Sequence, residues 1–161
     1  MKSVRKVKVS LTQAQQEKTE NILGGLRFLW NQYLSTRNKI YSECKVAVGA
    51  YEFNAYTNHV LSKTYPWIKD ISSKARKDCF LSLEKAFKRF FKGTANYPQF
   101  KSKKRDPVKS FYFIKDQVSI SPDKIKIPIL GEVKLLEKGY LTPDLQVTSG
   151  RVIKETDGYI S

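Results

Sequence analysis

The spacing of apolar residues changes twice along the chain, and this order restricts the folds that the chain can adopt. Residues 2–10 alternate apolar and basic side chains, which predicts a strand with one buried and one basic face. Residues 12–92 carry apolar residues at helical spacing, and the chain after about residue 106 returns to short strand-like runs separated by turn residues. A single N-terminal strand needs neighbours, so we expect strand 2–10 to join the later sheet.

The C-terminal strand-like runs are short and closely spaced, which is typical of small β-barrels. The sequence therefore predicts an α+β fold in which an antiparallel β-barrel carries a helical insertion. The barrel would comprise residues 1–10 and 106–161, and the helical lobe residues 11–105. A length of 161 residues fits one compact domain with such an insertion.

Local signals predict where the helices begin and end. Thr12, followed three residues later by Gln15, forms a capping-box pattern that predicts the start of the first helix. A pause in this helix is expected at the glycine pair of residues 24–25. A basic amphipathic helix is predicted over residues 72–92, with a serine cap at its start and Gly93 as its terminator.

The net charge of the chain favours a polyanionic partner. Thirty Lys and Arg residues outnumber fifteen Asp and Glu residues, which gives a formal charge of +15. Twelve of these cations but only three acids lie between Lys74 and Lys109, and the cations continue into a proline-containing segment that a membrane-bound helix would not need. Nucleic acid is therefore favoured over a membrane surface. The absence of an apolar leader and of a membrane-spanning stretch predicts a cytoplasmic protein.

Residues 87–105 interleave aromatic rings with cations, a combination that suits nucleic acid because cations neutralise phosphates and exposed rings stack on bases. Phe87 and Phe90 fit the apolar stripe of the preceding helix and are expected in the core. For Tyr97 and Phe100, base stacking and local packing are both open. The expected phosphate contacts of this run are Lys101, Lys103, Lys104 and Arg105.

No set of residues in the sequence suggests catalysis or metal binding. His59 is the single histidine and has no companion ligand or nucleophile, so a surface or packing role is expected. Cys44 and Cys79 both fall on apolar stripes, which predicts two buried, reduced thiols. No carboxylate pair and no glycine-rich phosphate loop stands in the context that such sites require.

Five segments resemble, in the same order, elements of the N-terminal part of TnpB, an insertion-sequence-encoded RNA-guided endonuclease related to the type V CRISPR effectors. The most specific are Leu-Glu-Lys-Ala-Phe-Lys-Arg-Phe-Phe-Lys-Gly and Tyr-Pro-Gln-Phe-Lys-Ser-Lys-Lys. The first segment departs from the family pattern because the usual proline before Thr12 is missing. The five segments are residues 6–12, 26–31, 83–93, 97–104 and 126–133.

The resemblance implies a wedge-type antiparallel β-barrel with an inserted helical recognition lobe, which together grip a guide RNA and read a short transposon-adjacent DNA motif. Tyr51, Ser73 and Lys77 fall where the family reads that motif. Arg27 and Asn31 match a family element, with phosphate contact and helix anchoring as alternative roles. The full set of candidate nucleic-acid-binding residues is Lys6, Lys8, Arg27, Asn31, Tyr51, Ser73, Lys74, Lys77, Lys88, Arg89, Lys92, Tyr97, Phe100, Lys101, Lys103, Lys104 and Arg105.

The resemblance also implies that the RuvC-like nuclease domain and the zinc ribbon of the family follow Ser161. The divalent metal and the zinc of the family are then expected outside this chain, which needs no cofactor and should bind guide RNA and double-stranded DNA without cutting them. Two alternatives stay open from the sequence. One is a compact nuclease in its own right, and the other is a nuclease-free DNA-binding regulator or assembly module that forms a homodimer.

Overall fold

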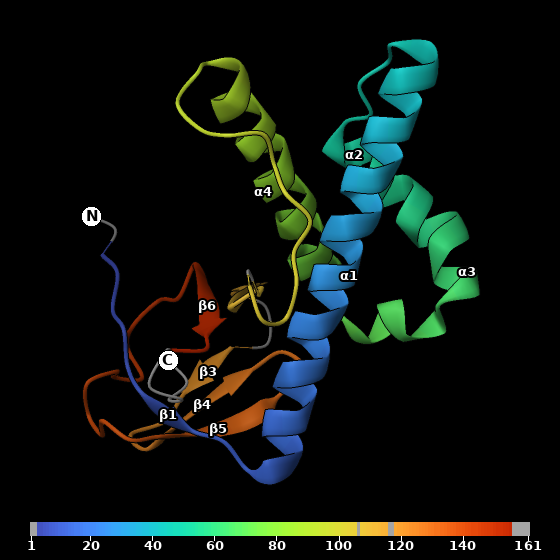
Figure 1. Ribbon diagram of the computed structural model, residues 1–161. Coiled ribbons are helices and arrows are strands. Elements are labelled where there is room, and N and C mark those ends of the chain that lie inside the picture. Colours follow the sequence, from blue (N-terminus) through green and yellow to red (C-terminus); the bar gives the residue numbers. More distant parts are fainter. Residues whose placement is uncertain (1–2, 106, 116–117, 156–161) are drawn as a thin grey trace. The chain divides into compact units, whose positions relative to one another are not determined.

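The computed structural model describes residues 3–105, 107–115 and 118–155, and the chain folds into two compact units (Figure 1). The strand unit comprises Met1–Ile22 and Lys109–Ser161, and the helical unit comprises Leu23–Val108. The structure combines helices with antiparallel strands, which is compatible with the predicted α+β class. The division of the chain into a barrel and an inserted lobe at the sequence-derived boundaries stays a prediction.

The strand unit contains a four-stranded antiparallel sheet and a separate two-stranded antiparallel pair. The larger sheet has the order β1-β5-β4-β3, so the N-terminal strand joins the later strands as expected. The smaller sheet pairs β2 with β6. The strands are β1 (Val9–Ser10), β2 (Ser110–Ile114), β3 (Ser119–Ile120), β4 (Lys124–Ile127), β5 (Gly131–Leu135) and β6 (Ser149–Ile153).

β1 is much shorter than the strand predicted over residues 2–10. Val9 lies opposite Leu135, and one further bond runs from the amide of Leu136 to the carbonyl of Lys8, at 2.9 Å. After Leu136 the partner segment enters bends and turns, which leaves residues 3–7 without a strand to pair with; residue 2 of the predicted strand lies outside the described residues. No ladder among the described residues joins the two sheets, and the closed barrel stays a prediction.

One glutamine fixes the first turn of α1 (Gln13–Cys44) to the larger sheet. Thr12 and Gln15 form the predicted capping box: the amide of Thr12 donates to Gln15 Oε1 (3.0 Å), and the amide of Gln15 donates to Thr12 Oγ1 (3.2 Å). Gln15 Nε2 also donates to the carbonyls of Leu130 (3.1 Å) and Glu132 (2.7 Å). The same side chain therefore caps the helix and ties it to the start of β5.

The helical unit has an aromatic core to which α1, α2 and α4 each contribute a ring. Tyr33 and Phe53 stack with a centroid distance of 4.8 Å, and Phe80 meets both rings edge-on. All three side chains are buried. The elements after α1 are α2 (Ala50–Tyr56), the π-helix η1 (Thr57–Leu61), α3 (Ser62–Thr64), the 3₁₀-helix η2 (Pro66–Asp70) and α4 (Ser73–Phe91).

α1 runs without a break through its glycine pair, so the predicted pause is wrong. The reason lies in the neighbours of Gly25, where a β-carbon would stand 2.4 Å from Ile71 Cδ1 and 2.9 Å from Trp67 Cζ3. Gly25 therefore permits η2 and the residue after it to pack closely against α1. It does not form a turn. At Gly24 a β-carbon would meet only Arg27 Nη2, at 3.7 Å.

α4 begins and ends where the sequence predicts. Its N-cap is Ser72, whose Oγ accepts a hydrogen bond from the amide of Ala75 (3.2 Å). Gly93, two residues after the end of the helix, has a φ of +78°, a conformation that glycine adopts without a steric penalty. The local capping signals are therefore sufficient to place this helix.

The two cysteines differ in their environment. Cys79 is buried with its Sγ 3.5 Å from the carbonyl of Leu26, and burial raises the pKa of the Cys79 thiol to about 12. Cys44 is exposed, so the prediction of a second buried thiol is wrong. Cys44 is the last residue of α1, and residues 41–47 are all exposed, because the helix extends beyond the part that packs in the core.

The two neighbouring glycines predict opposite effects of the same substitution. Gly24→Ala should raise the free energy of unfolding by about 0.5–1 kcal/mol, because alanine loses less backbone entropy in a helix. Gly25→Ala should lower it by about 1–3 kcal/mol, because the added methyl group overlaps Ile71 and Trp67. Urea unfolding followed by circular dichroism measures both changes. Two shifts of the same sign would contradict the packing role of Gly25.

The thiols predict selective alkylation of the native protein. At about pH 8, iodoacetamide should modify Cys44 alone, because the buried Cys79 thiol is protonated and inaccessible. Both thiols should react in urea, and intact mass spectrometry counts the adducts. Cys44→Ser is the matched control and should stay unmodified until the protein unfolds. Rapid labelling of native Cys44→Ser would show that Cys79 is accessible.

Candidate nucleic-acid interface

An extended segment rich in cations follows α4 and lies along α1 in the helical unit (Figure 1, yellow). We call this segment, residues 93–105, the basic strap. Trp30 Nε1 donates to the carbonyl of Gln99 at 3.0 Å. Asn31 Nδ2 donates to the carbonyl of Lys101 (2.9 Å), and Asn31 Oδ1 accepts from the amide of the same residue (2.8 Å). The strap is thus held to the helix through its backbone.

The two bonds of Asn31 take the place of those that a neighbouring strand would make to an extended backbone. Asn31 therefore has an anchoring role, although it anchors the strap and not a second helix. Asn38, two helical turns further along α1, accepts a hydrogen bond from the hydroxyl of Tyr97 (2.5 Å). Arg27 lies one turn before Asn31 and is half-buried, and its guanidinium makes no hydrogen bond to another described residue. Phosphate contact by Arg27 stays a prediction.

The rings around the strap divide into packed and exposed ones. Phe87 is buried as predicted, and Tyr97 meets it edge-on with a centroid distance of 5.4 Å. Phe90, expected in the core, is only half-buried. Tyr97 is thus packed locally, yet 40% of it is exposed. Phe100 is 55% exposed and has no ring contact with the other described residues.

The strap and the last turns of α4 carry cations without acids. Lys101 Nζ lies 4.5 Å from the centroid of the Trp30 ring, a cation–π contact. Lys103, Lys104 and Arg105 are exposed. Cations this closely spaced repel one another, and a bound anion relieves that repulsion. The acid-free stretch holds Lys85, Lys88, Arg89, Lys92, Lys101, Lys103, Lys104 and Arg105.

α2 and α4 bring two further candidates together. Lys77 Nζ lies 4.6 Å from the centroid of the Tyr51 ring, and Tyr51 is 65% exposed. Glu84 Oε2 on α4 accepts a hydrogen bond from the amide of Ala50 (3.0 Å), which fixes the start of α2 against α4. Ser73, the third residue that the resemblance places at a DNA motif, is the exposed first residue of α4. The Tyr51–Lys77 pair therefore presents a ring and an ammonium group side by side.

Arg76 is a buried cation that the sequence reasoning missed. Its Nε donates to the carbonyl of Ile71 (3.1 Å), and its Nη1 donates to Asn58 Oδ1 (2.7 Å). No carboxylate among the described residues pairs with it. Burial lowers the pKa of Arg76 from its usual value, but an arginine stays protonated in a protein. Arg76 fixes the first turn of α4 directly beside Lys77. In sequence, its place on an apolar helix face gave the only hint of burial.

The remaining candidate cations of α4 differ in their pairing. Lys88 Nζ lies 3.8 Å from Glu84 Oε1, a surface pair of small energetic value. Lys74, Arg89 and Lys92 are exposed and have no carboxylate partner in the described part of the chain. Within the described residues, three of these four predicted phosphate-binding cations therefore lack a counter-ion.

The strand unit carries its own group of cations. Lys6 forms an ion pair with Glu155, which offsets its charge. Lys8 lies on the face of the larger sheet that also holds Lys134, because Ser10, two residues after Lys8, pairs with Lys134. Lys124 pairs directly with Lys134 across β4 and β5. Two ammonium groups in opposite positions destabilise a sheet, and Glu132 Oε2, 4.0 Å from Lys124 Nζ, offsets part of this repulsion. The lysine alternation at residues 124–134 was the signal for this face.

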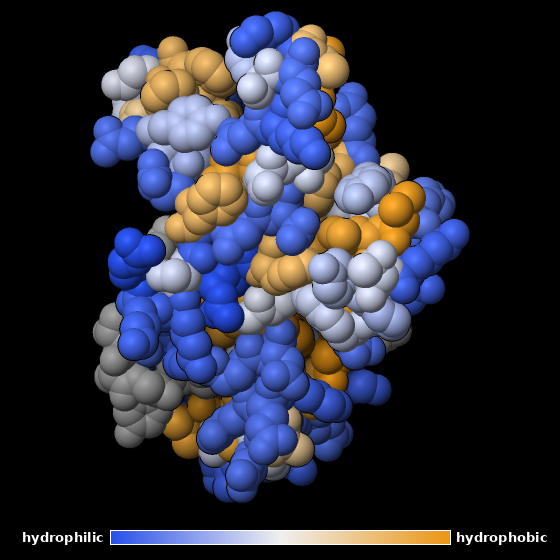
Figure 2. Space-filling view, turned by 45° about the vertical axis from the view of Figure 1, so that its right-hand side comes forward, coloured by the Kyte–Doolittle hydropathy of each residue, from blue (hydrophilic) through white to orange (hydrophobic). Residues whose placement is uncertain are grey.

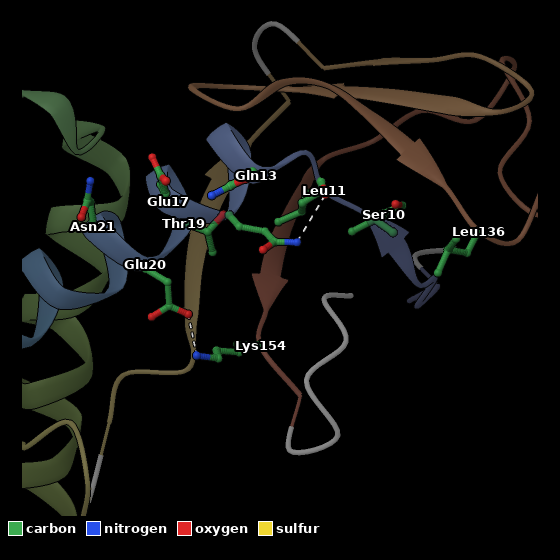
Figure 3. A pocket seen from close by; sticks show the side chains of 11 residues that line it. Ser10, Leu11, Gln13, Glu17, Thr19, Glu20, Asn21, Leu136 and Lys154 are labelled. Atoms are coloured by element: carbon green, nitrogen blue, oxygen red, sulfur yellow. Dashed lines mark hydrogen bonds and ion pairs between the residues drawn. The ribbon is translucent and has the colours of Figure 1, made fainter.

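An open pocket of about 890 Å³ lies between β1 and the first turns of α1 in the strand unit (Figure 3). Glu17 and Glu20 both line it, and Glu20 Oε1 lies 2.5 Å from Lys154 Nζ. Leu11 and Leu136 add apolar surface. Two carboxylates against one ammonium group repel phosphate, so this pocket does not suit a nucleic-acid backbone.

Hydrophilic residues predominate on the face shown in Figure 2, with smaller apolar patches between them. Within residues 3–105, 107–115 and 118–155, no three His, Cys, Asp or Glu side chains lie close enough together to hold a metal ion. In the same part of the chain, no helix has the length and apolar character that crossing a bilayer requires.

The first 45 residues match a family model, that of the helix-turn-helix domain of the IS605 OrfB proteins. Such a domain suggests nucleic-acid binding in a transposase-associated protein. It places the N-terminal region of the chain in the TnpB/IS605 OrfB family. No curated protein matches the chain.

Residues 13–44 within the matched region form one uninterrupted helix. A helix-turn-helix places two helices at about 90–120° with a short turn between them, and α1 contains no such turn. This region therefore has no short second helix that could enter a groove of DNA. Within the helical unit, the residues of α1 from Leu23 onward instead provide the surface on which the basic strap lies.

The hydrogen bonds of Asn31 predict how firmly the strap is held. Asn31→Ala removes two bonds worth about 1 kcal/mol each, so the strap should open at least about tenfold more often. Trypsin cleavage after the strap cations should accelerate by a similar factor. Gln32→Ala on the same helix is the control, because Gln32 makes no hydrogen bond to the strap. Equal cleavage of both variants would show that Asn31 does not anchor the strap.

Proposed function

We propose that this chain is the nucleic-acid-binding N-terminal region of a TnpB-like RNA-guided DNA endonuclease. Residues 11–105 act as the recognition lobe, and residues 1–10 with 106–161 act as the wedge-type barrel. The region binds a guide RNA and a transposon-adjacent motif in double-stranded DNA. The family match of residues 1–45 and the chemistry of the helical unit support this proposal.

The observation that carries the proposal is the acid-free basic strap held along α1. Its backbone is fixed by Trp30 and Asn31, so its exposed cations are presented on a defined path. Neutralising phosphates releases the counter-ions condensed on nucleic acid, which favours binding at low salt. Lys103, Lys104 and Arg105 therefore contact phosphates and do not read sequence.

The Tyr51–Lys77 pair supports contact with a DNA motif. An ammonium group that rests on an aromatic ring keeps the N–H donors on its outward side available, and guanine offers two acceptors in the major groove. Ser73, one turn before Lys77 on α4, adds a hydroxyl. In this proposal Tyr51 and Lys77 read bases, and Ser73 and Lys74 contact the adjacent phosphates.

The chain binds but does not cleave nucleic acid in this proposal. In the family that the chain resembles, the divalent metal and the zinc belong to the RuvC-like domain and the zinc ribbon. Incubation of the protein with labelled DNA or RNA and Mg²⁺ or Mn²⁺ tests this part. Cleavage that disappears with chelator would reject it.

Reversal of the strap charges predicts a large drop in affinity. Changing Lys101, Lys103, Lys104 and Arg105 to Glu should weaken binding of structured RNA at least about a hundredfold at low salt. The slope of log K against log salt should fall by about 0.9 for each duplex phosphate that the variant no longer neutralises. Fluorescence anisotropy over a salt series measures both quantities.

A matched variant carries the same charge change elsewhere in the helical unit, at Lys39, Lys45, Lys63 and Lys69. Each of these lysines is exposed and lies outside the candidate set. The control should retain most of the affinity. Equally weakened binding by the two variants would mean that only net charge matters, and a flat salt dependence would remove the phosphate-neutralisation argument.

A further inference from the structure

The C-terminal end of α4 exposes an aromatic residue that the proposed contacts do not use. Phe91, the last residue of the helix, is 73% exposed. No other aromatic residue of the described chain is exposed to this extent. A single exposed apolar residue needs no explanation by itself, but this ring is rigidly held and is surrounded by cations.

The helix end that carries Phe91 is firmly capped. The amide of Gly93 donates to the carbonyl of Phe90 (2.9 Å), and the amide of Thr94 donates to the carbonyl of Arg89 (3.0 Å). These two bonds, together with the positive φ of Gly93, form a Schellman cap. The hydroxyl of Thr94 donates to the same Arg89 carbonyl at 3.1 Å. Phe91 is therefore attached to ordered backbone and not to a loose chain end.

Two neighbouring aromatic rings pack against Phe91. Phe87, one turn earlier and buried, lies nearly parallel to it, with an interplanar angle of 25° and a centroid distance of 6.4 Å. Phe90 meets the Phe91 ring at 5.3 Å and the Tyr97 ring at 5.1 Å. Arg37 lies 4.0 Å from the centroid of Phe87. The ring of Phe91 is thus the exposed member of a packed aromatic group.

Cations surround this ring. Lys88 lies three residues before Phe91 and therefore on the same side of the helix. Arg89 and Lys92 are exposed and have no carboxylate partner among the described residues. The carbonyls at a helix C-terminus disfavour a phosphate directly at the helix end. A neutral base at the tip of the helix is not repelled by the C-terminal carbonyls. Its phosphates can at the same time lie against the surrounding lysines.

We propose that Phe91 is a stacking platform for an unpaired base, with Lys88, Arg89 and Lys92 on the flanking phosphates. The inference rests on the proposed function and adds a preference for single-stranded nucleic acid at this point. Bases inside a continuous duplex turn only their edges toward a protein, so a ring reaches a base face only in a single strand or at a duplex end. An aromatic ring accepts every base, so the platform does not select sequence.

A strand whose central nucleotides lack bases distinguishes the contribution of stacking to binding from the contribution of charge. The probe is a labelled single strand of about 12 nucleotides, compared with a strand of equal length whose central nucleotides are abasic. Both carry the same phosphates. The wild-type protein should bind the strand with bases about tenfold or more tightly. Phe91→Ala should reduce this ratio to near one and leave the salt slope unchanged.

Two further variants complete the experiment. Phe91→Trp restores a ring and should restore the ratio. Tyr41→Ala removes another exposed ring, which lies 5.4 Å from Lys45 Nζ, and should leave the ratio unchanged. Circular dichroism checks that every variant is folded.

Three results would overturn the inference. In the first, the wild-type protein binds both strands equally. In the second, Phe91→Ala keeps the preference for bases, which would place the base contact at another residue. In both cases salt-dependent binding persists, so the proposed function survives. In the third, no strand binds in a salt-dependent manner, which rejects the platform and the proposed function together.

Discussion

The helical unit depends on side chains of α1 that satisfy the backbone of an extended segment. An extended chain beside a helix has no ladder of its own, and each unpaired backbone group that it buries lowers stability. Trp30 and Asn31 supply the missing partners for Gln99 and Lys101, and Asn38 fixes the hydroxyl of Tyr97. Without these bonds the mutual repulsion of the strap cations would favour a detached chain. Polar side chains on one helix thus determine where the positive charge of the following segment is placed.

The charge of the molecule is organised by the absence of acids as much as by the number of cations. Glu20 and Glu155 pair with lysines of the strand unit, and Glu84 accepts a hydrogen bond from the amide of Ala50 at the junction of α2 and α4. From Lys85 to Arg105 there is no acid at all. In the strand unit, Lys124 and Lys134 face each other across two strands, and Glu132 Oε2 lies 4.0 Å from Lys124 Nζ.

Local sequence signals predicted the parts of the fold that depend on neighbouring residues in the chain. The capping box of Thr12 and Gln15 and the bounds of α4 are of this kind, because a cap is formed by residues three or four positions apart. The joining of the N-terminal strand to the later sheet followed from the order of apolar periods. Gly25 shows the limit of such reasoning, since its role depends on η2, more than forty positions away. Cys44 shows another limit, because an apolar stripe does not reveal where packing against it stops.

The candidate interface was predicted by composition but not by geometry. The residues with cations and rings were evident in the sequence, whereas the role of Asn31 as a strap anchor required the carbonyl of Lys101 to be located. The exposure of Phe91 was hidden because it lies four positions after the buried Phe87 and shares its helical stripe. Arg76 was missed because a basic residue on an amphipathic helix is expected at the surface.

The burial of Arg76 has a consequence for the surface above it. Mobile ions screen an exposed lysine effectively, but they have little access to a buried guanidinium, so salt screens the charge of Arg76 less. Arg76 precedes Lys77, whose ammonium group lies over Tyr51. The first turn of α4 therefore combines one positive charge that depends only weakly on salt with exposed lysines whose charge is screened as the ionic strength rises.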